Sequence, residues 1–167
     1  LQWEEEILWE EAQRASFTES FDKIKKLIGD GKISKAVPIV FERTLSLMCA
    51  NYLAPMLRNI IKAPHVLNIY GFWSKGCGVL GASPELLYLC HETNVQTMAL
   101  AGTAPKIDQQ NNRINPEDLL KDPKERYEHQ LVVEDIVGVL SELGSISVTE
   151  TKILELPQLY HLLSRIS

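Results

Sequence analysis

The amino-acid sequence predicts an α+β protein in which a largely antiparallel sheet is layered with helices. Four short β-like runs follow one another closely between residues 66 and 101, separated by glycine, lysine and asparagine turns. Helical periodicity precedes these runs at residues 18–28 and follows them from Pro123 onward. The 167 residues are 45% hydrophobic, which is enough apolar material for one sizeable core.

The first part of the chain is expected to hold two helices. Residues 4–13 place Ile7 and Leu8 among acidic residues, which favours a short surface helix within an N-terminal segment 1–15. Residues 18–28 carry apolar side chains at helical spacing, and Gly29 supplies the stop. We therefore expect a surface helix and then an amphipathic helix before the β-rich region.

The segment that follows changes from helical to extended character. Residues 32–42 (KISKAVPIVFE) include Pro38, which cannot donate a ladder hydrogen bond and so favours an edge strand or a bulge. Residues 45–62 return to an apolar helical pattern that is interrupted around Pro55. The sequence thus predicts an extended edge segment followed by a broken helix.

The β-rich region and the remaining chain complete the expected order of elements. The four β-like runs, VLNIYGFW, CGVLGAS, LLYLCHE and VQTMALA, are spaced as an antiparallel meander. Residues 106–116 are polar and predict an exposed loop, and residues 117–120 predict a short helical turn. Pro123 then opens a long helix that is expected to end at Gly144. Residues 146–156 alternate in the manner of a strand.

Composition narrows the functional classes. The net charge of −5 and the pI near 5.4 argue against nucleic acid as a partner, because nucleic-acid binding rewards basic patches. No apolar run approaches the length of a membrane span, and the acidic beginning LQWEEEILWEE does not resemble a signal peptide. Cys49, Cys77 and Cys90 are scattered without metal-ligand spacing, which favours reduced thiols and a cytoplasmic location.

Several sequence blocks together resemble the chorismate-utilising enzymes. This family includes isochorismate synthase, salicylate synthase, anthranilate synthase component I and aminodeoxychorismate synthase component I. The blocks, in family order, are ISKAV (33–37), GASPELL (81–87), ALAGT (99–103), DPKERYEHQLVVEDI (122–136) and, more weakly, LYHLLS (159–164). The resemblance covers residues 16–167 and implies part of a chorismate-binding, anthranilate synthase component I-like fold.

Members of this family are considerably longer than this chain. The resemblance therefore implies that residues 16–167 are part of a catalytic domain whose C-terminal lobe is absent. A later glycine-rich loop and a C-terminal helix with a second metal-binding glutamate would be missing. A sheet face left bare by that lobe would favour self-association of the chain.

The resemblance implies an acid and a base. Glu85 follows Ser83-Pro84, a turn stiffened by the proline, and matches the family's general acid. Lys35 matches the lysine that acts as general base on water in isochorismate- and salicylate-forming members, where anthranilate-forming members usually carry glutamine. From the residues alone, Glu85 could be a solvated turn glutamate and Lys35 a solvated lysine at a strand start. Pro38 after Lys35 departs from the family pattern and would reshape that strand.

The resemblance also implies a metal ligand and a substrate site. Glu128 matches a family glutamate that binds Mg²⁺, and the resemblance favours this over the alternative of a solvated helix face. Gly102 and Thr103 would offer backbone amides to substrate carboxylate oxygens. Ala101 stands where many aminodeoxychorismate synthases carry an attacking lysine, and so leaves room for water or ammonia. His161 matches a family histidine near the substrate, or is a core histidine that a backbone carbonyl satisfies.

The function that the resemblance implies is isochorismate synthase-like. Such an enzyme would isomerise chorismate by Mg²⁺-assisted addition of water and loss of hydroxyl, in menaquinone or siderophore biosynthesis. One alternative is an anthranilate or aminodeoxychorismate synthase component I that uses ammonia and a glutamine amidotransferase partner. Another is a non-catalytic truncated module, because the second metal ligand would be missing.

Overall fold

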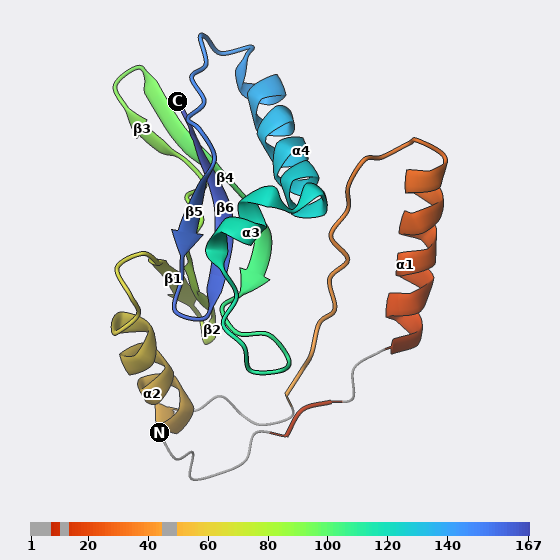
Figure 1. Ribbon diagram of the computed structural model, residues 1–167. Coiled ribbons are helices and arrows are strands. Elements are labelled where there is room, and N and C mark those ends of the chain that lie inside the picture. Colours follow the sequence, from red (N-terminus) through yellow and green to blue (C-terminus); the bar gives the residue numbers. More distant parts are fainter. Residues whose placement is uncertain (1–7, 11–13, 45–49) are drawn as a thin grey trace. The chain divides into compact units, whose positions relative to one another are not determined.

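The computed structural model describes residues 8–10, 14–44 and 50–167 of the chain (Figure 1). The chain divides into two compact units, Leu1–Ala63 and Pro64–Ser167, and each is described by itself. Both helices and antiparallel sheets are present, so the predicted α+β class is confirmed.

Two helices account for most of the regular structure of the N-terminal unit. Helix α1 (Arg14–Gly29) contains the predicted amphipathic helix, and Phe17 and Phe21 stack one turn apart with ring centroids separated by 5.9 Å. Helix α2 (Ala50–Ile61) contains Pro55 in its interior, so the proline did not interrupt the helix as predicted. Residues 45–49 of that predicted helix lie outside the described residues.

The predicted edge strand at residues 32–42 is wrong for this structure. Residues 33–43 form no strand in the part of the chain that the structure describes. Thr44 makes an isolated antiparallel bridge with Trp9, and the Glu10 amide donates to the Arg43 carbonyl over 2.8 Å. A strand needs a partner ladder, and no second strand is described in this unit. Apart from residues 8–10, the helix predicted at residues 4–13 lies outside the described residues.

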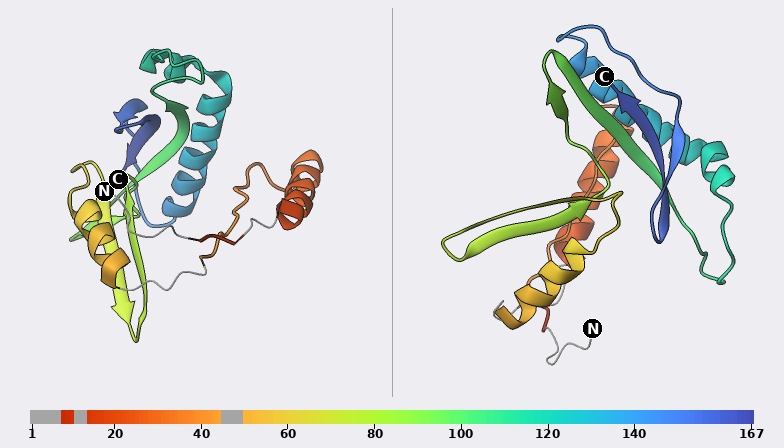
Figure 2. Two further views of the ribbon diagram at one scale, coloured as in Figure 1. Left: turned by 90° about the horizontal axis from the view of Figure 1, so that it is seen from below. Right: turned by 90° about the vertical axis from the view of Figure 1, so that its left-hand side faces the viewer.

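The C-terminal unit contains two sheets (Figure 2). Strands β1 (Asn68–Ser74) and β2 (Cys77–Ser83) form a hairpin whose turn, Lys75-Gly76, has positive φ at both residues. The other sheet has the order β3-β4-β6-β5 and is antiparallel throughout. Its strands are β3 (Leu89–His91), β4 (Asn94–Pro105), β5 (Lys152–Glu155) and β6 (Leu159–Ile166).

The single meander predicted from spacing is therefore wrong. Strands β2 and β3 do not pair, because the Ser83-Pro84-Glu85 turn and the residues after it separate the two hairpins. Strand β6 pairs with both β4 and β5, and the sequence pattern did not predict a strand there. Of the strand expected at residues 146–156, only β5 and an isolated bridge between Val148 and Ile166 are formed.

Side-chain caps fix the starts of the two C-terminal helices. In α3 (Pro116–Lys121), the Asn115 side chain accepts from the Glu117 amide. In α4 (Pro123–Leu140), the Asp122 side chain accepts from the amides of Lys124 and Glu125 over 2.9 and 3.0 Å. The predicted start at Pro123 is confirmed, whereas the helix ends four residues before the predicted Gly144.

The core of the C-terminal unit lies where α3 and α4 cover β4 and β6 (Figure 1). These elements contribute the following buried apolar side chains: Met98, Ala99, Ala101, Leu119, Tyr160, Leu162 and Ile166. Two polar residues, His129 and Ser164, are buried among them. None of the helices in the described part of the chain is long and apolar enough to cross a membrane.

Candidate functional site

A bulge in β4 organises the best-defined polar corner of the C-terminal unit. The register between β4 and β6 shifts between Ala101 and Thr103, so that Gly102 is the inserted residue. Gly102 has φ +82°, a left-handed conformation that glycine adopts without strain. A Cβ at this position would lie 3.0 Å from the Glu125 carbonyl oxygen and 3.0 Å from Leu162 Cδ1. Glycine is therefore required both by the backbone angle and by the close approach of α4.

Thr103, immediately after the bulge, has two polar contacts. Its backbone amide donates to Glu125 Oε2 over 2.8 Å. Its hydroxyl shares a 2.8 Å hydrogen bond with His161 Nδ1, as expected for residues directly opposite on neighbouring strands. Thr103 is exposed and His161 is half-buried, so this corner is accessible from solvent. We call Gly102, Thr103, Glu125 and His161 the bulge corner.

The Glu125 carboxylate is held in its charged form. Its side chain is only 16% exposed, and this burial by itself raises the pKa of the carboxyl. The Lys124 ammonium and the Thr103 amide more than offset the burial, so the pKa of Glu125 lies below its ordinary value. The bulge corner thus consists of a backbone amide that already binds a carboxylate, with a hydroxyl and an imidazole beside it.

Behind the bulge lies a chain of buried hydrogen bonds. His129 on α4 contacts the Ala101 carbonyl oxygen through Nδ1 at 3.1 Å and Ser164 Oγ through Nε2 at 2.9 Å. Ser164 Oγ in turn lies 3.0 Å from Thr151 Oγ1. These hydrogen bonds connect helix α4 to Ala101, the residue that immediately precedes Gly102.

Glu128 lies on α4 one helical turn after Glu125 and is half-buried. Two carboxylates one turn apart are donors of the kind that Mg²⁺ uses together with water and substrate oxygens. Among the described residues, no group of three or more metal-ligating side chains is gathered. Both Glu125 oxygens are engaged by Thr103 and Lys124, so Glu128 is the carboxylate of this pair that could hold Mg²⁺, and its role stays a prediction.

Glu85 lies in a different place, an open groove of about 780 Å³. The Glu85 amide donates to Ser83 Oγ over 3.1 Å, and Asn68 Nδ2 donates to the Glu85 carbonyl over 3.3 Å, so the turn is fixed at both sides. The groove is otherwise mainly apolar, with residues of β1, β4 and the C-terminal half of α4 in its walls. Its described lining includes no residue of the bulge corner.

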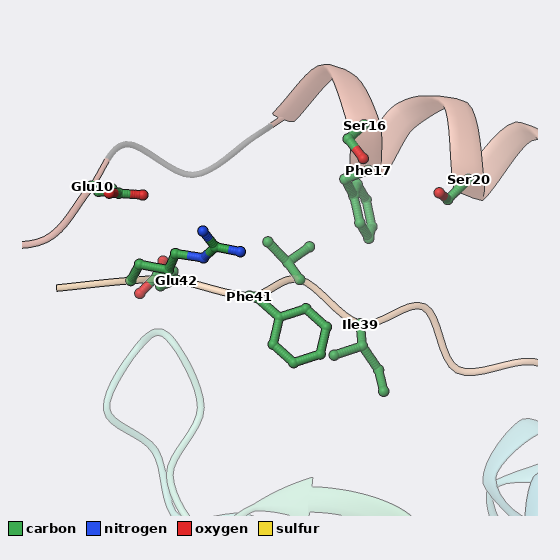
Figure 3. A pocket seen from close by; sticks show the side chains of 9 residues that line it. Glu10, Ser16, Phe17, Ser20, Ile39, Phe41 and Glu42 are labelled. Carbon is green, nitrogen blue, oxygen red and sulfur yellow. The ribbon is translucent and has the colours of Figure 1, made fainter. Parts of the chain in front are cut away.

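Lys35 belongs to the N-terminal unit, where it is half-buried in the irregular segment before Pro38. A cavity of about 200 Å³ lies further along this segment, between residues 39–43 and α1 (Figure 3). Phe17 projects into it from α1, opposite Ile39 and Phe41 (Figure 3). The described residues that line it include no residue that the sequence assigned to the active site. The pairing of Lys35 as general base with Glu85 as general acid stays a prediction.

The structure thus brings Ala101, Gly102, Thr103 and His161 together around the bulge. Sequence reasoning did not single out Glu125 or His129, although both stand in the block that carries the family resemblance. The available signal was helical spacing: residues 125, 128, 129 and 132 share one face of a helix that begins at Pro123. The contacts of that face depend on the bulge, which no local pattern predicts.

Comparisons with known proteins place these residues in a family context. A family model described as chorismate binding enzyme matches residues 2–167. The isochorismate synthase MenF of Pasteurella multocida (strain Pm70) is 32% identical over 169 residues, which cover 96% of this chain and 38% of that protein. Anthranilate synthase component 1 of Bacillus subtilis (strain 168) is 26% identical over 167 residues, covering 91% of this chain and 30% of that protein. The chain therefore spans roughly a third of the length of each relative, 38% of one and 30% of the other.

Solved structures give the same fold. The crystal structure of DhbC from Bacillus anthracis, assigned as a 2,3-dihydroxybenzoate-specific isochorismate synthase, has a TM-score of 0.71 to this structure. The match covers 99% of this chain and 47% of that one, with 22% sequence identity. At that identity the likeness concerns the fold alone.

Proposed function

The chain belongs to the chorismate-binding enzyme family, and we propose that it forms part of an enzyme that converts chorismate into isochorismate. The observation that carries the proposal is the bulge corner, where the exposed Thr103 hydroxyl and the His161 imidazole lie side by side. Chorismate is a dicarboxylate, and a hydroxyl and an imidazole can both donate to one of its carboxylates. The 32% identity to an isochorismate synthase over nearly the whole chain favours this reaction within the family.

The proposed reaction adds water at one ring carbon and expels hydroxide from another. Lys35 would take a proton from the attacking water, and Glu85 would donate a proton to the leaving oxygen, so that water is lost.

Glu128 would hold magnesium together with water and the ring carboxylate of chorismate. When bound, the ion would neutralise that carboxylate and fix the ring in place. Ala101 has no nucleophilic side chain, so attack would come from water or, in the alternative reaction, from ammonia. The relationship to anthranilate synthase component 1 supports retaining this ammonia-dependent alternative. That reaction would draw ammonia from a glutamine amidotransferase partner.

We expect no measurable conversion of chorismate by the 167-residue chain alone. One or two carboxylates bind Mg²⁺ weakly, because this ion needs several oxygen ligands. The exposed apolar side chains of Val37, Ile39 and Phe41, 71%, 72% and 81% exposed, should also promote self-association. Product chromatography and light scattering check both expectations. Rapid turnover or a clean monomer would contradict them.

The experiment that tests the proposed function uses a longer protein that contains this chain. Purified protein is incubated with chorismate and Mg²⁺, with and without ammonium, and the products are separated by chromatography. We expect isochorismate in both conditions, and none from the Lys35→Ala variant even though chorismate still binds. Anthranilate or aminodeoxychorismate formed only with ammonium would support the alternative. Unchanged turnover by Lys35→Ala would remove the proposed base.

A further inference from the structure

Helix α4 contains a buried titratable side chain that the proposed reaction does not use. His129 is 4% exposed and Ser164 is 1% exposed, although both are polar. A buried polar group is costly unless its hydrogen bonds are satisfied. Both ring nitrogens of His129 have partners, and Ser164 has a second partner in Thr151. These buried polar side chains lie directly behind the bulge at Gly102.

We propose that His129 is a positioning residue that holds the Gly102–Thr103 bulge in the shape that places the Thr103 hydroxyl beside His161. The Ala101 carbonyl oxygen can only accept a hydrogen bond, so the proton of a neutral His129 ring must be on Nδ1. Nε2 is then an acceptor and requires the Ser164 hydroxyl as its donor. Ser164 can still accept from the Thr151 hydroxyl. The Ala101 carbonyl thus determines which atom is the donor in each of these hydrogen bonds, from His129 to Thr151.

The location of the Ala101 carbonyl explains why this bond matters for the site. At a bulge the regular ladder is disrupted, so backbone groups need other partners. Ala101 is the residue before the inserted Gly102, and Thr103 is the residue after it. Helix α4 contacts the Ala101 carbonyl through His129 and the Thr103 amide through Glu125. These two contacts fix the backbone on both sides of the bulge. His129 therefore acts through the backbone, with no need to touch the substrate.

Two matched substitutions separate this role from simple core filling. In His129→Asn the side-chain amide nitrogen takes the place of Nδ1, so donation to Ala101 is retained and the Ser164 contact is lost. In His129→Gln a polar atom reaches the place of Nε2, so the Ser164 contact is retained and the Ala101 carbonyl loses its donor. If His129 only fills space, the two variants should disturb the bulge equally.

The first test is made on the 167-residue chain by NMR and needs no activity. We expect ¹⁵N signals of His129 that show a proton on Nδ1. We expect the amide signals of Gly102 and Thr103 to move in His129→Gln and to stay near their wild-type positions in His129→Asn. A ring with no proton on Nδ1, or equal displacement in both variants, would overturn the proposal. The tautomer is measured on the wild type, so it decides even if neither variant folds.

The second test rests on the proposed function and uses the longer enzyme with chorismate. We expect His129→Gln to raise KM about tenfold with a smaller change in kcat, a factor equivalent to about 1.4 kcal/mol and typical of one lost hydrogen bond. His129→Asn should stay within about threefold of the wild type, a change below that of one hydrogen bond. Equal KM values for the two variants would contradict the positioning role. A wild-type enzyme that leaves chorismate unchanged would refute the proposed function instead, and would leave the NMR result standing.

Discussion

The two compact units differ in how far their side chains are buried. In the C-terminal unit, Leu162, Ile166 and Ser164 are almost completely buried, and α4 packs on the sheet that contains them. In the N-terminal unit, no described residue is buried. Large apolar side chains such as Phe41 are instead exposed there.

This difference bears on the candidate site. The bulge corner is held by contacts within the C-terminal unit, including those of Thr103 with Glu125 and His161. Lys35 lies in an irregular segment of the other unit, where no ladder is described. The bulge corner is thus formed by local contacts of one unit, whereas the predicted base, Lys35, belongs to the other. The predictions below compare residues of the C-terminal unit with counterparts in the N-terminal unit.

The largest difference is expected for core truncation. Leu162 is fully buried, so Leu162→Ala should lower the free energy of unfolding by about 3 kcal/mol. Phe41 is 81% exposed, so Phe41→Ala should change it by less than about 0.5 kcal/mol. Urea titrations followed by circular dichroism measure both. Similar losses for the two variants would mean that Phe41 is covered in solution.

The next largest difference in stability is expected between alanine substitutions at Gly102 and at Gly29. Gly102→Ala must adopt φ near +82° and place a Cβ against Glu125 and Leu162, so we expect a loss of about 2 kcal/mol. At Gly29, which ends α1, an added Cβ meets nothing within 4 Å. Gly29→Ala should therefore be neutral or stabilising by up to about 1 kcal/mol. Thermal unfolding of both variants checks this, and a harmless Gly102→Ala would contradict the described bulge.

A smaller, pH-dependent effect is expected for Glu125. Its folded-state pKa is lowered, so its charge contributes stability above the unfolded-state value near 4.5, and this contribution is lost as pH falls through the folded pKa. Glu125→Gln should therefore be less stable than the wild type at pH 7, with the difference shrinking below pH 4.5. Urea midpoints across this range provide the measurement. A difference that is constant with pH would contradict the depressed pKa.

The smallest effect is expected for a Glu–Lys ion pair on α1, the counterpart of the Glu125–Lys124 pair on α4. Glu19 and Lys23 form an ion pair at 2.6 Å, but their side chains are 70% and 71% exposed. Solvent and salt screen such a pair, so Glu19→Gln should leave the urea midpoint within experimental error. Repeating the titration at high salt is the control. A clear loss of stability at low salt only would show that the surface pair contributes more than its exposure suggests.

Local signals predicted the helices better than the strands. Asp122-Pro123 marks the start of α4 because an N-cap and a proline at the first turn act within a few residues. Strand β6 was missed because Leu162 and Leu163 are adjacent and Ser164 is buried, which breaks simple alternation. Ser164 can be buried only because His129 and Thr151 satisfy it, and those contacts are tertiary.

In the candidate site, too, the sequence predicted individual residues but not their tertiary contacts. The resemblance named Gly102, Thr103 and His161, and the structure brings Thr103 and His161 into contact. The contact of Glu125 with the Thr103 amide could not be predicted, because it requires both the bulge and the packing of α4 on β4. The roles of Lys35, Glu85 and Glu128 stay predictions.

Hydrogen–deuterium exchange of a longer protein that contains this chain, with and without chorismate and Mg²⁺, tests the central claim most directly. If the bulge corner binds a substrate carboxylate, peptides covering residues 99–105 and 159–163 should exchange more slowly when chorismate is present. The exposed hairpin turn at Lys75-Gly76 should be unaffected. Protection confined to other segments, with unchanged exchange at residues 99–105 and 159–163, would contradict the assignment of the substrate site to the bulge corner.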